Sequence, residues 1–419
     1  MSDMVKYLPE AAIPDGGVPV WRTEDADRWR KAAVPAVFGP VFGAWALVLP
    51  VLVAFVLLAW TEPQAPIRGT VWADYPAAVL LVSLPLWYRL LPAATALAAA
   101  ALAGYALFAL TGLPPGDSPG RAGCRLVIAM SGAAFAGALL RLRARRRQYA
   151  LALAAAGDGR RELPARLPGS HRRRGLPMML AGGGLCAAAA ALLGWALAQD
   201  LGSDPDLPYD GTGQQVLALL LLVPGIPVLG HGIGARRAAR RLDTGPQPAL
   251  RVGVRGDLGP YTWLHPDVRD TSGRPLIAFR DRIENTEYDV RTLVGGAEEK
   301  LRAEHHDVNH FSEPFEAVLY GAPFEGAEVV LECAAYSGDT RITTSVLAVR
   351  LHPRRRHDLS GWTPAGRSYR IEARRNEAAR REARASDSGS SGSGCGSSGS
   401  CGSDSSCGSS CGGGCGGGD

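Results

Sequence analysis

An arginine-rich stretch between two long apolar runs, residues 141–174, constrains this chain more than any other feature. It contains eleven arginines against two acidic residues, Asp158 and Glu162. The apolar runs on both sides have the length and composition of membrane spans, and basic segments between such runs stay on the cytoplasmic face. The pattern therefore predicts a multi-pass membrane protein, and it fixes the side of the membrane on which every other segment lies.

The apolar runs predict a membrane domain of residues 38–235, an α-helical bundle with six spans. The clearest run, residues 38–60, carries no charge and is long enough to cross a hydrocarbon layer of about 30 Å. Spans two and three are expected within residues 76–113, where Arg89 is the only charge and indicates a tight cytoplasmic turn. A single merged span is the alternative, but it would put the arginine-rich stretch outside the cell. The last three spans are expected at residues 126–140, 176–198 and 214–233.

The charges that flank these runs predict that both termini lie in the cytoplasm. Residues 1–37 contain six acidic residues, lack the early apolar run of a cleavable signal peptide, and are expected to form a cytoplasmic N-terminal segment. Residues 200–210 contain four aspartates and no basic residue, which favours an external loop. We therefore expect a multi-pass protein of the cell membrane, with the lipid bilayer as its first partner. Four arginines follow the last span and predict that it ends in the cytoplasm: Arg236, Arg237, Arg240 and Arg241.

From about residue 249 the pattern changes to short alternating runs that predict β-strands. Turn residues such as Gly, Ser and Asp separate the runs, and the pair that flanks residues 337–339 has the form of a hairpin. Short strands at this density in residues 249–353 predict a cytoplasmic all-β domain, either a small barrel or a sandwich. The expected strands are residues 250–254, 261–265, 276–280, 287–294, 315–320, 328–335 and 341–351.

The end of the chain predicts a charged helix followed by a disordered tail. Residues 367–385 are rich in alanine and charge with little apolar face, which is typical of a solvated helix. Residues 386–419 are almost entirely Gly and Ser apart from five cysteines. Reduced thiols on a flexible segment can wrap Zn or Cu, although CxxC pairs are missing. The alternatives are a tail without a ligand and a tail modified by redox or covalent chemistry. The candidate ligands are Cys395, Cys401, Cys407, Cys411 and Cys415.

His306 and His310 form a second candidate metal site, since on a short helix they would share one face at i, i+4. The pattern is not HExxH, and a hydrated surface loop explains the same residues. Cys333 is expected in the core of a strand rather than as a nucleophile. The sequence has no GxSxG, no Walker loop and no GxGxxG followed by a suitably placed acid, so it predicts no enzyme.

The charge distribution also bears on function. The expected spans contain no Asp, Glu or Lys, whereas ion-coupled transporters need ionisable groups at depth. Aromatic residues are not interleaved with the arginines, which argues against nucleic-acid binding. The favoured prediction is a membrane-anchored interaction protein whose β domain binds a cytoplasmic protein partner. A metal-responsive protein that uses the tail thiols and a transporter or channel subunit are the alternatives.

By overall plan the chain resembles uncharacterised multi-pass integral membrane proteins of high-GC Gram-positive bacteria, some of which end in Gly/Cys-rich tails like residues 386–419. The arginine bias agrees with a high-GC genome, because lysine occurs only at Lys6, Lys31 and Lys300. The resemblance covers the architecture and the tail. It implies a membrane location but no functional residues.

Overall fold

The chain divides into two compact units, Met1–Ser368 and Tyr369–Asp419. In the second unit the structure describes only Arg381, which lies in a helix. The rest of the predicted charged helix, and the whole of the predicted tail, therefore lie outside the described residues. The computed structural model describes residues 8, 10, 13–59, 70, 72–114, 116–203, 209–256, 261–270, 274–280, 315–337, 341–353 and 381.

The helices of the first unit follow the predicted spans, and five in the described part of the chain are long and apolar enough to cross a membrane. The remaining helix, α3, has 16 residues and a length of about 24 Å at 1.5 Å per residue. A typical hydrocarbon layer is about 30 Å thick, so the crossing of α3 stays a prediction. The helices are α2 (Pro40–Ala59), α3 (Tyr75–Leu90), α4 (Pro92–Gly112), α5 (Ser118–Ala156), α7 (Leu176–Leu201) and α8 (Thr212–Asp243).

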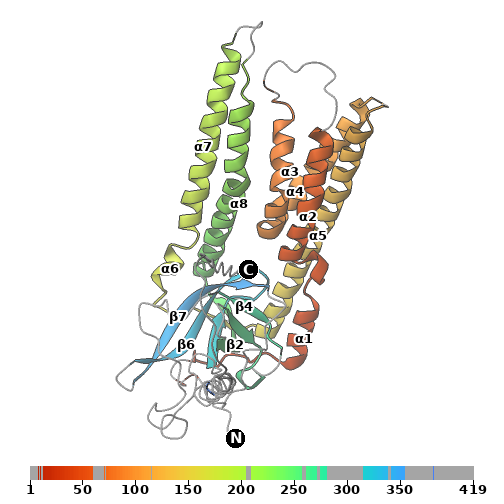
Figure 1. Cartoon of the computed structure of the whole chain (residues 1–419). Coiled ribbons are helices and arrows are strands. Elements are labelled where there is room, and N and C mark those ends of the chain that lie inside the picture. Colours follow the sequence, from red (N-terminus) through yellow and green to blue (C-terminus); the bar gives the residue numbers. More distant parts are fainter. Residues whose placement is uncertain are drawn as a thin grey trace, which may run out of the picture. The chain divides into compact units, whose positions relative to one another are not determined.

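Consecutive helices run in opposite directions, and one end of the set adjoins the β-strands (Figure 1). We call this the barrel end; α3 and α8 finish there, whereas α4 and α7 finish at the far end. The break between α3 and α4 at Leu91 confirms the predicted turn beside Arg89. The helix α5 continues past the predicted fourth span and remains helical through the first half of the arginine-rich stretch.

Glycines let α7 and α8 pack backbone against backbone. A Cβ at Gly182 of α7 would lie 2.8 Å from the carbonyl oxygen of Gly225 in α8. Nearer the barrel end, a Cβ at Gly232 would lie 2.8 Å from the carbonyl oxygen of Gly175. Real Cβ atoms do not approach backbone this closely. Small residues are what allow two membrane helices to come together at such a distance.

The ring of Tyr88 in α3 packs against glycines of α2 and α5. A Cβ at Gly43 of α2 would lie 2.8 Å from Cζ of Tyr88, and one at Gly137 of α5 would lie 3.0 Å from its Cε2. The hydroxyl of Tyr88 donates to the carbonyl oxygen of Phe38, 3.0 Å away. The ring is buried, so this single side chain joins three helices near the barrel end.

Six antiparallel strands close into a barrel in the order β2-β3-β4-β7-β6-β5, with β5 returning to pair with β2. The prediction of a barrel is thus confirmed and the sandwich alternative is wrong. The predicted hairpin is confirmed as well, since Ser337 of β6 pairs with Arg341 of β7. The expected strand at residues 287–294 lies outside the described residues. A short strand, β1 (Arg160–Arg161), pairs antiparallel with the start of β2. The strands of the barrel are β2 (Gln247–Gly256), β3 (Thr262–His265), β4 (Ile277–Phe279), β5 (Phe315–Tyr320), β6 (Glu328–Ser337) and β7 (Arg341–His352).

Alternate residues of the strands form the core of the barrel, as the two-residue period of a β-strand requires. They are buried and almost all apolar, and they pack as one cluster. The members on the strands are Leu250, Val252, Val254, Leu264, Ile277, Phe279, Phe315, Ala317, Leu319, Val329, Leu331, Cys333, Leu347, Val349 and Leu351.

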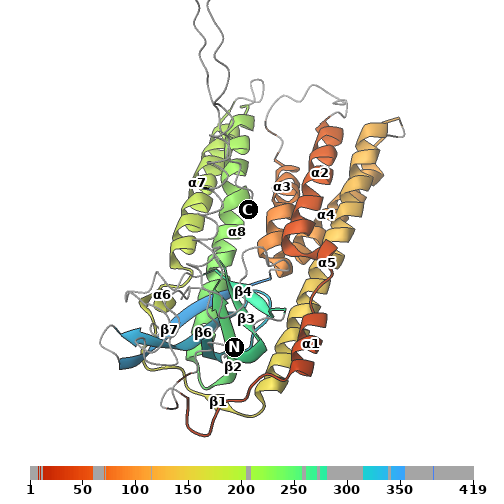
Figure 2. The same cartoon turned by 60° about the horizontal axis from the view of Figure 1, so that its bottom comes forward.

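Residues from outside the strands complete this core. Two tryptophans belong to the same buried cluster: Trp21, just before α1 (Thr23–Lys31), and Trp29 within α1. Ala152 and Ala156 at the end of α5 belong to it as well. The indole nitrogen of Trp29 donates to the carbonyl oxygen of Pro323, 3.0 Å away. Figure 2 shows α1 beside the end of α5, next to the barrel. The residues assigned from sequence to a separate N-terminal segment therefore contribute to the barrel core.

The outer face of the barrel is covered in part as well. Leu8, Val18 and Leu242 pack on apolar side chains that point away from the core. Glu316 of β5 holds this cover in place: its Oε2 accepts from the backbone N–H of Leu8 at 3.1 Å, and its Oε1 accepts from Nε of Arg251 at 2.8 Å. The covered side chains are Ala249, Val318, Tyr320, Val330 and Ala348.

Candidate functional site

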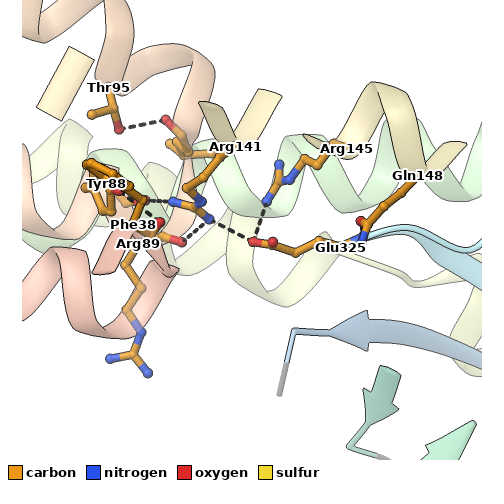
Figure 3. Close-up of polar contacts among 9 residues, drawn as sticks. Phe38, Tyr88, Arg89, Thr95, Arg141, Arg145, Gln148 and Glu325 are labelled. Atoms are coloured by element: carbon orange, nitrogen blue, oxygen red, sulfur yellow. Dashed lines mark hydrogen bonds and ion pairs between the residues drawn. The ribbon is translucent and has the colours of Figure 1, made fainter. Parts of the chain in front are cut away.

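A buried arginine of α5 links the membrane helices to the barrel. The side chain of Arg141 is only 1% exposed. Its guanidinium group donates to the carbonyl oxygens of Tyr88 and Arg89 at the end of α3, and its Nη2 lies 3.3 Å from Oε1 of Glu325 (Figure 3). It also lies 5.3 Å from the centroid of the Tyr88 ring. A cation at the C-terminal end of a helix is favourable, because the last carbonyls there lack helical partners.

Glu325 lies between β5 and β6 and receives several contacts from one face of α5. Its Oε1 is 3.8 Å from Nη2 of Arg145, in addition to Arg141. Its backbone N–H donates to Oε1 of Gln148 at 3.1 Å. Arg141, Arg145 and Gln148 stand at i, i+4 and i+7, the spacing that puts side chains on one face of a helix (Figure 3). This polar face of α5 is therefore the surface on which the barrel docks.

A second set of contacts joins the barrel to α7 and α8. Nε of Arg174, just before α7, lies 2.9 Å from Oε2 of Glu328 in β6. Nη1 of Arg350 in β7 lies 2.6 Å from Nε2 of His231 in α8. Burial raises the pKa of Glu328, an effect that Arg174 and Arg350 oppose. Burial also lowers the pKa of Arg350. Largely buried charged groups thus hold the barrel to α7 and α8 as well as to α3 and α5.

His171 of α6 (Gly169–Arg172) adds a contact at the same end. It is buried, and its Nε2 lies 3.0 Å from Oδ1 of Asp243 at the end of α8. The segment between α5 and α7 is thereby tied to α8. The arginine-rich stretch, predicted as a retention signal, consequently also supplies structural contacts to the barrel and to α8.

The metal ligands predicted from the sequence are not among the residues that the structure describes. His306, His310 and all five tail cysteines lie outside the described residues. Among the residues that the structure describes, no group of three or more His, Cys, Asp or Glu side chains is placed to hold a metal ion. The Zn or Cu hypothesis stays a prediction from the sequence.

Cys333 lies in the barrel core, as expected for a structural thiol. It is buried in the cluster of inward-facing side chains, next to Ala317 across the β5–β6 pairing. Burial raises the pKa of its thiol, and the charge of Glu332 raises it further. The thiolate is the reactive form of cysteine, so this environment disfavours nucleophilic chemistry.

The residues that the sequence analysis missed are Arg141, Glu325 and Arg350. The only signal in the sequence was the i, i+4, i+7 spacing of polar residues on α5, because nothing local marks the barrel residues that meet them. Comparisons of the chain with protein-family models, with curated proteins and with solved structures found no match. The functional proposal therefore rests on the contacts between the helices and the barrel.

Proposed function

We propose that this protein is a multi-pass protein of the cell membrane that presents its barrel at the cytoplasmic face as a docking module for a cytoplasmic protein. One observation carries the proposal: the barrel is fixed to the helix ends by the buried Arg141–Glu325 pair, whose side chains are 1% and 7% exposed. A barrel held in this way keeps a fixed orientation to the membrane. That arrangement suits the presentation of a binding surface.

The charges at the two ends of the helices support the orientation. At the barrel end, α8 finishes with four arginines after its apolar run, and five of the seven arginines of α5 lie beyond residue 140. At the far end, Asp200 accepts from the indole nitrogen of Trp72 at 2.8 Å, and Asp74 accepts from the hydroxyl of Tyr105. Arginines collect on the cytoplasmic side of membrane proteins. A crossing by α3, with Arg89 at its barrel end, gives six spans.

The connection between β4 and β5 is our candidate for the partner-binding segment. Residues 280–314 join the end of β4 at Phe279 to the start of β5 at Phe315. Segments that connect the strands of a rigid scaffold frequently carry binding residues. His306 and His310 belong to this connection, so a role in partner binding is an alternative to their role as metal ligands.

The orientation is tested with reporters fused to the full chain. We expect a reporter after Asp419 to be active in the cytoplasm, and a reporter inserted after Gly112 to be active outside the cell. The expectation follows from an even number of crossings with the arginine-rich end inside. A matched insertion after Gly157, in the arginine-rich stretch, should give the cytoplasmic result. External activity of the Asp419 fusion would overturn the orientation.

Partner binding is tested with a chain in which residues 281–313 are replaced by a Gly/Ser linker of the same length. This change leaves every described strand intact. We expect the wild-type chain to capture a defined cytoplasmic protein from its own cells, and the replaced chain to capture much less of it. The melting temperature of both chains is measured alongside, to show that the barrel stays folded. Equal capture by both, or capture of nothing, would contradict the proposal.

A further inference from the structure

Three arginines from three elements come together at the barrel end of the helices. They are Arg145 of α5, Arg174 before α7 and Arg350 of β7, and we call them the arginine rim. A Cβ at Gly326, in the turn before β6, would lie 3.4 Å from Nη2 of Arg145 and 3.8 Å from Nη2 of Arg350. Two guanidinium groups therefore meet over one turn of backbone. Arg174 lies close enough for its charge to oppose the charged form of Arg350.

Among the residues that the structure describes, the acidic side chains at the junction do not balance this positive charge. With Arg141, the junction holds four guanidinium groups, and the carboxylates that pair with them are those of Glu325 and Glu328. Glu325 is shared, because a single oxygen faces both Arg141 and Arg145. In the described part of the chain, the buried Nε of Arg145 has no hydrogen-bond partner. Partly buried cations in excess are costly, and an anion placed between them would offset that cost.

The neighbours of Arg350 do not supply the missing charge. Its Nη1 lies 2.6 Å from Nε2 of His231, where a ring nitrogen that accepts this bond belongs to a neutral imidazole. The nearest carboxylate that acts on Arg350 is Glu328, which is already hydrogen-bonded to Arg174 at 2.9 Å. The rim therefore has donor groups to offer to an additional anionic ligand.

The rim lies at the depth where lipid headgroups would be. The apolar part of α7 begins at Leu176, two residues after Arg174, and α5 becomes polar at Arg141 after its apolar run. The side chains of Arg145 and Arg174 are 22% and 27% exposed, so the protein does not fully enclose either of them. A guanidinium group can donate two parallel, charge-assisted hydrogen bonds to the oxygens of a phosphate.

We propose that the arginine rim binds the phosphate of an anionic phospholipid in the leaflet next to the barrel. The lipid phosphate lies over Gly326 between Arg145 and Arg350, with Arg174 at its edge, and its acyl chains follow the apolar surfaces of the helices. This site is independent of the protein partner proposed above. It gives the barrel a contact with the membrane surface as well as with the helices.

The test measures which lipid stays with the purified full-length chain. The protein is reconstituted with equal amounts of phosphatidylglycerol and phosphatidylcholine, extracted in mild detergent, and examined for bound lipid by native mass spectrometry. We expect retention of phosphatidylglycerol over phosphatidylcholine. In the Arg145→Gln, Arg350→Gln double variant, we expect that preference to fall by about thirtyfold, since two arginines near a headgroup together contribute roughly 2 kcal/mol. Equal retention of both lipids by the wild type would overturn the proposal without any variant.

Two controls separate the site from general charge and from folding. Arg143→Gln with Arg146→Gln removes the same charge from exposed positions of α5 and should keep the preference. The Arg145→Lys, Arg350→Lys double variant keeps the positive charge, so it should retain part of the preference for phosphatidylglycerol. Loss of the preference in the Arg143, Arg146 variant would show a diffuse surface effect and overturn the site. Release of the lipid by millimolar inorganic phosphate would assign the rim to a soluble phosphate instead, which also overturns the proposal.

Discussion

Replacing Glu325 with Gln is expected to lower the free energy of unfolding by about 3–5 kcal/mol, the usual cost of removing one partner of a buried ion pair. The carboxylate faces Arg141 at 3.3 Å and Arg145 at 3.8 Å, and neither it nor Arg141 is exposed to solvent. Gln has nearly the same shape, so the packing of the junction is kept. What is lost is the negative charge that offsets two guanidinium groups.

The effect is measured as the melting temperature of the full chain in detergent, followed by tryptophan fluorescence. The matched control is Glu24→Gln, because Glu24 pairs with Arg28 at 3.7 Å but its side chain is 86% exposed. Exposed pairs contribute little, so this variant should melt like the wild type. A double variant, Arg141→Met with Glu325→Leu, should recover much of the lost stability, because it removes the more deeply buried of the two guanidinium groups together with the carboxylate. A Glu325→Gln protein that melts with the wild type would show that the pair does not hold the junction.

Gly182→Ala is expected to separate α7 from α8 and to lower the melting temperature by several degrees or more. The added Cβ would lie 2.8 Å from the carbonyl oxygen of Gly225 and 2.8 Å from Cα of Leu229. Both are backbone atoms, which cannot rotate away as a side-chain end can. The helices must therefore move apart, and the close van der Waals contact that replaces a hydrophobic driving force inside a bilayer is lost.

The neighbouring glycines of the same helix provide the controls. A Cβ at Gly183 or at Gly184 meets nothing within 4 Å. Alanine is also a better helix former than glycine, so Gly183→Ala and Gly184→Ala should be neutral or slightly stabilising. Membrane accumulation and melting temperature of the three variants are compared. Equal behaviour at all three positions would rule out backbone contact as the basis of the α7–α8 pairing.

Local pattern was enough to predict most of the elements of this protein. Runs without charge indicated the helices, and the lone Arg89 between two of them indicated the turn at Leu91. Alternation of apolar residues indicated the described strands of the barrel, and the turn residues near 337–339 indicated the β6–β7 hairpin. Both periodicities are set by the geometry of one segment, so they can be read without knowing what the segment packs against.

Contacts between residues far apart in the chain could not be predicted from these local patterns. Arg141 was interpreted as one of many arginines that keep a loop in the cytoplasm, yet its partner Glu325 is 184 positions away in the chain. Trp29 was placed in a separate segment, yet its indole donates to Pro323 beside the barrel core. The spacing of charges along a chain does not tell a paired, buried arginine from a solvated one. The sequence by itself determined which segments are helices or strands and which helices are apolar. Only the tertiary structure decided that the barrel docks on α5, because a buried charge is identified by the surface that meets it.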